Sequence, residues 1–196
     1  MLHMATRVQY VSEQIGFGVF ATRDIPVGTI IVVLDPFDIV VSKEDAAQLS
    51  AILISNAERY MYRNKNGDFV LSWDNAKYLN HSCFANTMMT DYGFEIVVRD
   101  IRAGEQITTE YGLLNVQEEF DVDCGCESCR RKVCVTDIDM YYPQWDRLIC
   151  NAIKSVKDVQ QPLYDLLNID LQHEISRVAE GQSEYSSILN LKWRGF

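Results

Sequence analysis

Three cysteines crowd into residues 124–129, in the pattern C-x-C-x-x-C. Thiolate sulfur is a preferred ligand of zinc, and thiols this close together rarely serve only to fill a core. The start of the chain has no basic stretch followed by an apolar one. We therefore expect a reducing compartment, where clustered cysteines bind metal more often than they pair. The spacing predicts a metal site, with Cys134 as an alternative ligand, and the competing interpretation is a reduced, metal-free turn.

Gly16 and Gly18 open a second segment of interest, residues 16–21, which matches the pattern G-x-G-x-x-A. That pattern also marks dinucleotide-binding turns, which need a helix to begin at the second glycine. Pro26 and Gly28 follow closely, with β-branched residues between them, so no helix of useful length can form there. We therefore exclude a Rossmann-type site. A glycine pair alone is equally compatible with a bulge or a turn, so its meaning depends on the motifs that accompany it.

Two further motifs accompany the glycine pair. Residues 78–83 read Tyr-Leu-Asn-His-Ser-Cys, with Asn86 beyond them, and residues 104–112 read Gly-Glu-Gln-Ile-Thr-Thr-Glu-Tyr-Gly. In this order and spacing, the three segments resemble the SET domain of protein-lysine methyltransferases. That family shows a G-x-G turn, a pattern close to R-F-x-N-H-S-C-x-P-N and a pattern close to G-E-E-L-T-x-D-Y-G. The match covers roughly residues 6 to 112.

The resemblance implies transfer of a methyl group from S-adenosylmethionine to a lysine side chain, with Tyr111 as the catalytic residue. The backbone of the glycine segment would hold the methionine end of the cofactor, because glycine lets a ligand approach closely. Asn80 would bond the cofactor's amino or carboxylate group. The full set of cofactor-binding residues implied in this way is Gly16, Phe17, Gly18, Tyr78, Asn80, His81, Tyr111 and Phe120.

Two residues of that set have further expected roles. The backbone around His81 would bond the adenine, and we expect its side chain to be structural rather than a general base. Phe120 would stack on the adenine. The resemblance also implies that the cysteine ending the second motif joins the cluster as a post-SET zinc site, whose ligands are Cys83, Cys124, Cys126 and Cys129. Cys150, on an apolar helix face, is expected to be a buried small hydrophobe.

The chain departs from the family pattern at Leu34, Met89 and Thr109, where some members carry an aromatic residue, and at Ala85, where the pattern has proline. The first three positions influence how many methyl groups fit beside the amine. Fewer tyrosine hydroxyls and smaller side chains would leave more room. The sequence therefore predicts that di- or trimethylation is sterically allowed.

Short strands must position these motifs. β-branched runs broken by glycine and proline predict strands near residues 8–11, 18–21, 29–34, 37–41, 69–71, 94–98 and 106–108. One helix is expected over residues 42–62, capped by Ser42 with Asp45 three residues on. Asn64 to Gly67 predicts a turn.

After the cysteines, apolar residues at helical spacing predict three or four short helices, with Pro162 at the start of one and Gly181 at the end. The expected fold is a mainly β SET fold of several small sheets, with a knot-like threading of the C-terminal motif, plus a small all-α C-terminal extension. The expected domains are a SET domain over 6–112 with an insert at 42–72, a post-SET zinc segment over 113–134, and a helical extension over 135–196.

The composition limits the partners. The chain has 196 residues, 47% of them hydrophobic, a formal net charge of −10 and no long apolar run, so we expect a folded protein without a membrane span. An acidic surface repels phosphate and attracts basic peptides, so we expect a lysine-rich protein substrate, such as a histone tail, and no nucleic acid. The charge could equally serve only solubility. The acidic residues crowding the expected substrate wall are Glu118, Glu119, Asp121, Asp123 and Glu127.

Two other functions remain open from the sequence. The chain could be a non-catalytic SET and zinc module that binds peptides or partner proteins, or a redox sensor built on the cysteine cluster. The presence of Tyr111, Asn80 and the glycine pair favours the enzyme. We expect an intracellular protein, cytoplasmic or nuclear, and the sequence leaves the substrate protein, the methylation state and the oligomeric state open.

Overall fold

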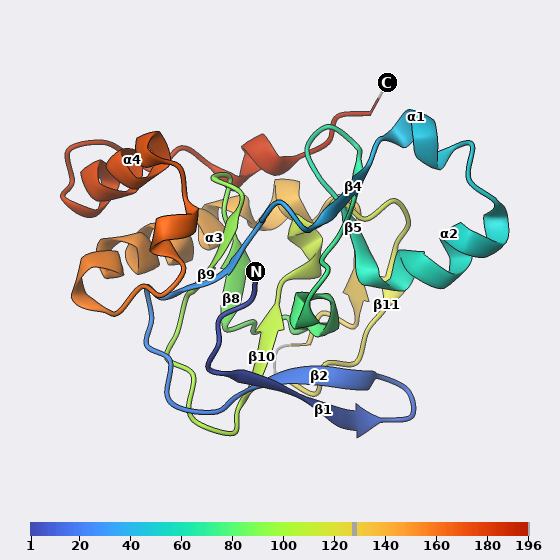
Figure 1. Ribbon diagram of the computed structural model, residues 1–196, viewed down its shortest axis with the longest axis horizontal. Helices are drawn as coiled ribbons and strands as arrows, with labels where there is room; N and C mark the ends of the chain where they lie inside the picture. Colours follow the sequence, from blue (N-terminus) through green and yellow to red (C-terminus); the bar gives the residue numbers. More distant parts are fainter. Residues whose placement is uncertain (127–128, 196) are drawn as a thin grey trace.

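A computed structural model describes residues 1–126 and 129–195 (Figure 1). Small antiparallel sheets make up its centre, and helices lie at its two ends. The strands are β1 (Thr6–Ser12), β2 (Gly16–Ala21), β3 (Ile30–Val33), β4 (Ile39–Val41), β5 (Met61–Arg63), β6 (Phe69–Leu71), β7 (Asn80–His81), β8 (Thr87–Met89), β9 (Phe94–Val97), β10 (Gln106–Thr109), β11 (Phe120–Asp121) and β12 (Lys132–Val133). The α-helices are α1 (Lys43–Ala46), α2 (Ala51–Ala57), α3 (Asp137–Lys154) and α4 (Ile169–Ala179).

Short 3-10 turns connect several of these elements. They are Glu58–Tyr60, Asn75–Tyr78, Tyr111–Leu113, Val156–Asp158, Tyr164–Leu166 and Ile188–Leu191. The expected combination of several small sheets with a C-terminal helical region is confirmed. Within the described ranges, none of the helices combines the length and apolar character needed to cross a bilayer.

The strands form separate small sheets. Their orders are β1-β2-β10-β7, β3-β9-β8, β4-β6-β5 and β11-β12. Pairing is antiparallel except between β7 and β10, which run parallel, with Asn80 opposite Thr108 and His81 opposite Thr109. The glycine segment continues as strand β2 rather than opening a helix, which confirms that no Rossmann-type turn exists there. Each predicted strand overlaps an observed one.

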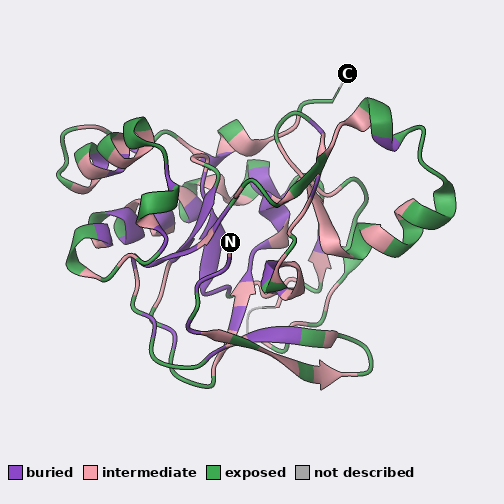
Figure 2. Ribbon diagram, in the orientation of Figure 1, coloured by how far each residue is buried: buried purple, intermediate pink, exposed green. Residues whose placement is uncertain are grey.

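Two apolar clusters hold the molecule together (Figure 2). In one of them, α3 packs on the β3-β9-β8 sheet and α4 packs on α3, and the buried residues of α3 include Trp145, Ile149 and Ile153. The other cluster lies around β2, β10 and the segment before β7. The C-terminal helices therefore share a core with the sheet that leads into the second motif.

Direct bonds also join the two ends of the chain. The side chain of Gln161 accepts a hydrogen bond from the N–H of Ile30 at 3.0 Å and donates to the carbonyl of Gly28 at 2.7 Å. A Cβ at Gly112 would lie 2.8 Å from the indole of Trp145. The turn that follows the Glu-Tyr-Gly motif therefore rests directly on α3.

The single helix predicted over residues 42–62 is wrong. The chain forms two short helices, α1 and α2, and ends this stretch in strand β5. The cap is as predicted, because the hydroxyl of Ser42 accepts a hydrogen bond from the N–H of Asp45. No residue of α2 is buried and Ile52 is 74% exposed, so the apolar spacing finds no surface that would stabilise a longer helix (Figure 2).

Of the two helix boundaries predicted in the C-terminal region, one is confirmed and one is wrong. The helix end at Gly181 is confirmed, since α4 ends at Ala179 and Gly181 adopts a positive φ of 71°. The helix start at Pro162 is wrong. Helix α4 begins at Ile169, because Asn168 caps it by accepting the N–H of Leu171. The turn predicted at residues 64–67 is confirmed by the bond from the Gly67 N–H to the Asn64 carbonyl.

The close approach at Gly28 predicts a large stability cost for Gly28→Ala. The residue has a φ of +89°, and a Cβ there would lie 2.8 Å from Ser155 and 2.9 Å from the carbonyl oxygen of Ala152. Strain and overpacking together should lower the free energy of unfolding by about 2–5 kcal/mol, measured by urea denaturation. Gly104→Ala is the control, because its φ is +83° and nothing lies within 4 Å of its Cβ position. It should cost only about 1–2 kcal/mol, and equal losses in the two variants would contradict the packing argument.

Candidate active site and metal centre

The parallel pair of β7 and β10 brings the second and third motifs together. The hydroxyl of Tyr111 donates a hydrogen bond to the carbonyl of Leu79 at 2.8 Å, and the N–H of Tyr111 donates to Nδ1 of His81 at 3.2 Å. Burial, with the charge of Glu95, raises the pKa of Tyr111 to about 12. The phenol therefore stays protonated at neutral pH and is held by two bonds to residues some thirty positions earlier.

Asn80 and the glycine segment meet on this sheet. The side-chain amide of Asn80 donates to the carbonyl of Phe17 at 3.0 Å. A Cβ at Gly18 would lie 2.9 Å from the amide nitrogens of Asn80 and Gln106, so no other residue fits there without a shift. The ring of Phe17 makes an edge contact with Tyr78 at a centroid distance of 5.9 Å. The structure therefore gathers most of the residues that the resemblance implied for the cofactor.

His81 is neutral in this setting. Burial, with the nearby charge of Arg130, lowers its pKa to about 4. Its Nδ1 accepts the Tyr111 N–H, and its Nε2 lies 3.2 Å from the sulfur of Cys83. The ring therefore connects the Tyr111 backbone with the first cysteine of the cluster.

A buried ion pair connects the cysteine segment with the third motif. Arg130 makes two bonds to the carboxylate of Glu110, at 3.0 and 2.8 Å, and lies 3.2 Å from Asp137 of α3. Its guanidinium also lies over the rings of Tyr141 and Trp145, at 4.9 and 5.7 Å. Burial raises the pKa of Glu110, and Arg130 opposes that effect. One side chain thus joins three segments beside Tyr111.

The sulfurs of Cys83, Cys124, Cys126 and Cys129 all lie within 4.8 Å of one another. Backbone N–H groups point at three of them: that of Cys83 at Cys124, that of Arg130 at Cys83, and that of Arg131 at Cys129, at 3.3–3.4 Å. Burial alone would raise the pKa of Cys124, but hydrogen bonds from the Cys83 N–H and from its cysteine neighbours lower it to about 6. Four crowded sulfurs with N–H donors fit a closed tetrahedral zinc site.

The other cysteines lie outside this group. The sulfur of Cys134 faces Glu119 at 3.9 Å, and Cys150 is half-buried against the core of the helices. Of the acidic residues named for the substrate wall, Glu127 lies outside the described residues. Glu118 and Glu119 line the cavity described next.

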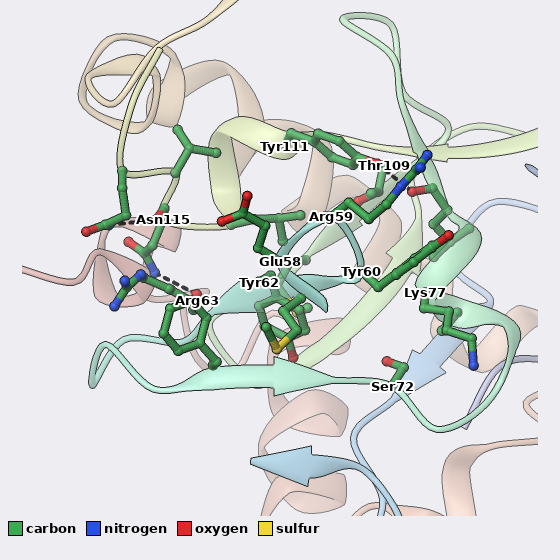
Figure 3. A pocket seen from close by; sticks show the side chains of 18 of the residues that line it. Glu58, Arg59, Tyr60, Tyr62, Arg63, Ser72, Lys77, Thr109, Tyr111 and Asn115 are labelled. Atoms are coloured by element: carbon green, nitrogen blue, oxygen red, sulfur yellow. Dashed lines mark hydrogen bonds between the residues drawn. The ribbon is translucent and has the colours of Figure 1, made fainter. Parts of the chain in front are cut away.

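A cavity of about 820 Å³ opens beside Tyr111 (Figure 3). Its lining combines aromatic and apolar side chains with charged ones, which are Asp38, Glu58, Glu95, Glu118, Glu119, Arg59, Arg63 and Lys77. Leu34, Met89 and Thr109, the positions that depart from the family pattern, all line it, as does Phe120. Of the other residues expected to bind cofactor, neither the glycine segment nor Tyr78, Asn80 and His81 are among its lining residues. Of the residues implied for the cofactor, only Tyr111 and Phe120 are therefore among the described lining residues of this cavity.

Two charged residues in this region were not singled out from the sequence. Arg130 directly follows the last clustered cysteine, and only the folded chain shows that it reaches Glu110. Glu95 lines the cavity and is 5% exposed. Its signal in the sequence is a single carboxylate inside the apolar run of residues 94–98.

Comparison with known proteins identifies the domain. Residues 16–112 match the SET domain family, so a SET domain occupies this part of the chain. The chain is similar to two Arabidopsis thaliana proteins that carry the name histone-lysine N-methyltransferase. ASHH4 is 27% identical over 132 residues, which cover 62% of this chain, and ASHH3 is 32% identical over 65 residues, which cover 30%. The chain spans 38% and 18% of the lengths of these relatives.

A solved structure is also similar. It is the methyltransferase domain of human histone-lysine N-methyltransferase SETMAR, with a TM-score of 0.47 and 16% identity, covering 68% of this chain and 58% of that one. The family match assigns the chain to the class of SET-domain proteins, and the relatives named here carry the name histone-lysine N-methyltransferase.

The buried ion pair predicts that Arg130→Met destabilises the fold. The substitution would leave the carboxylate of Glu110, which is fully buried, without its cation. A loss of about 3–5 kcal/mol in the free energy of unfolding is expected, measured by urea denaturation. The neighbouring Arg131→Met is the control, because its ion pair with Asp123 is exposed on both sides and should contribute only about 0–1 kcal/mol. Similar losses in the two variants would show that the buried ion pair contributes no more to the free energy of unfolding than the exposed one.

Proposed function

We propose that the protein transfers a methyl group from S-adenosylmethionine to the side-chain amine of a lysine in a basic protein substrate. One observation supports this most directly. Within a SET domain, the phenol of Tyr111 lies at the wall of an 820 Å³ cavity, with its hydroxyl 2.8 Å from the Leu79 carbonyl. A protonated phenol and a carbonyl at the same point can orient an amine and a polarised methyl group.

Most of the residues proposed to hold the cofactor are not among the described lining residues of the cavity. The space that a Cβ at Gly18 would need is taken by the side-chain amides of Asn80 and Gln106, so glycine at this position lets Asn80 lie close against the strand. Tyr78 and His81 flank this segment, and Phe120 would close it from β11. When bound, S-adenosylmethionine supplies a methyl group on a positively charged sulfur.

The cavity would prepare the lysine. A lysine amine must be neutral to react, and its ordinary pKa is about 10.4. Apolar walls such as Leu34, Met89 and Tyr62 disfavour the charged form and exclude water. The lining also carries the basic residues Arg59, Arg63 and Lys77. Its acidic residues Glu58, Glu118 and Glu119 can pair with basic residues beside the target lysine. Histone tails fit that description, as do other basic proteins of the cytoplasm or nucleus.

Tyr111→Phe tests the catalytic role directly. Loss of the hydroxyl should lower the rate of labelled-methyl transfer into core histones or a proteome extract by about 10²–10³-fold. Cofactor affinity, measured by calorimetry, should change little. Tyr164→Phe is the control, because its hydroxyl also donates to a carbonyl, that of Gln172 at 2.9 Å, but it lies in the helical region. A Tyr111→Phe protein with the wild-type rate would refute the assignment.

We also propose that the four clustered cysteines bind one structural zinc ion. The protein purified under reducing conditions should then hold about one zinc per chain, measured by plasma mass spectrometry. Cys129→Ser should lose most of it, because a hydroxyl is a poor replacement for a thiolate ligand. Cys134→Ser should keep it, since Cys134 lies outside the cluster. Equal zinc loss in both variants, or a wild-type protein without zinc, would contradict the proposal.

A further inference from the structure

Glu95 is a buried carboxylate at the wall of the cavity. It is 5% exposed, and the groups that interact with it are the neutral hydroxyls of Thr87, at 2.9 Å, and Thr109. Among the ion pairs of the described part of the chain, none includes Glu95. Taking a carboxylate out of water costs several kcal/mol unless a cation or several donors compensate it. The charged form of Glu95 therefore lacks a compensating cation among the described residues.

Strand pairing directs this carboxylate toward the cavity. Glu95 lies opposite Val32 of β3 and Met89 of β8, and both of these residues line the cavity with it. The neighbours of Glu95 along β9, Phe94 and Ile96, belong instead to the core formed with α3 and α4. Side chains alternate between the two faces of a sheet, so these assignments agree.

The surroundings of Glu95 leave room for a cationic ligand. The side chain of Thr109, also on the cavity wall, is buried beside Glu95, and its hydroxyl interacts with that carboxylate and favours its charged form. The charge of Glu95 helps to raise the pKa values of both Tyr62 and Tyr111, which places the carboxylate near both phenols. Burial raises the pKa of Glu95 itself to about 7. An entering cation would therefore stabilise the charged form of this carboxylate.

A second buried carboxylate at the cavity, that of Asp38, accepts hydrogen bonds from the backbone, unlike Glu95. Asp38 also lines it, but its two oxygens accept the backbone N–H groups of Asp35 and Trp73, at 2.9 and 3.1 Å. Those bonds give Asp38 a structural explanation. Glu95, between two apolar neighbours, has no comparable explanation, and an aliphatic residue would serve packing better there.

We propose that Glu95 recognises the positively charged amine of the substrate lysine as it enters the cavity. This role rests on the function proposed above. The carboxylate and the Thr109 hydroxyl offer acceptors to an ammonium group, and the walls formed by Val32, Met89 and Tyr62 suit its alkyl chain. Because the bond to Glu95 favours the charged amine, it contributes to capture of the substrate rather than to the transfer itself.

The test uses n-butylammonium, the side chain of lysine without its backbone, and n-butanol as the neutral counterpart. The probe signals are the ¹³C-labelled methyl groups of methionine, because Met61 and Met89 line the cavity while Met4 and Met140 are exposed. In the wild-type protein, n-butylammonium should shift the Met89 signal saturably, and n-butanol should bind at least about tenfold more weakly. Absence of a saturable shift, or equal binding of the two probes, would overturn the proposal.

Two variants and a control locate the effect. Glu95→Gln keeps the shape and the bond from Thr87, and should weaken n-butylammonium binding at least about tenfold. Glu95→Asp keeps the charge and should keep the preference for the cation, so it tests the proposal even if Glu95→Gln does not fold. Glu184→Gln removes an exposed carboxylate that does not line the cavity and should leave the Met89 response in place. Unchanged binding in folded Glu95→Gln, lost preference in folded Glu95→Asp, or an equal loss in Glu184→Gln would each refute the role of Glu95.

The same samples separate this inference from the function on which it rests. Glu95-dependent binding of n-butylammonium, in a wild-type protein that transfers no labelled methyl to any protein, would refute the proposed function and show that the cavity takes another amine. Methyl transfer without any dependence of amine binding on Glu95 would refute the inference and leave the function standing.

Discussion

The parallel pairing of two short strands is the constraint on which the site depends. Asn80 and His81 of β7 lie beside Thr108 and Thr109 of β10, and this register alone places the Tyr111 N–H on His81 and the Tyr111 hydroxyl on the Leu79 carbonyl. Parallel strands cannot be joined by a tight turn, so the intervening chain must leave and return. The intervening chain forms β8 and β9, which contribute residues both to the cavity lining and to the core shared with α3 and α4.

The buried ion pair of Arg130 also stabilises the region around Tyr111. Arg130 neutralises Glu110, the residue immediately before Tyr111, and reaches Asp137 at the start of α3. The N–H of Arg130 also points at the sulfur of Cys83. The cysteine cluster, the tyrosine motif and the first C-terminal helix therefore share one residue. A disturbance in any of the three is transmitted to the others by a contact that is costly to break while buried.

The sequence predicted the parts of this protein that local chemistry determines. β-branched runs between glycines and prolines located the strands, and the spacing of Trp145, Ile149 and Ile153 located the buried face of α3. The helix over 42–62 failed because periodicity shows that a face is apolar and does not show that anything covers it. The proximity of Cys83 to the other clustered cysteines came from family resemblance, since forty residues separate it from the nearest of them. The partners of Arg130 and the isolation of Glu95 depend on segments distant in sequence, and no local pattern contains that information.

The contact between Gly112 and Trp145 has a consequence for where the functional unit ends. The family match stops at residue 112, yet the backbone at that position lies so close to the indole of α3 that even a methyl group would collide with it. Gln161 binds the backbone beside β3 in a similar way. The helices after the cysteines thus pack directly against the SET domain and help to stabilise it. A fragment that ends at residue 112 would lack α3, and the side of Gly112 that packs against Trp145 would be exposed to water.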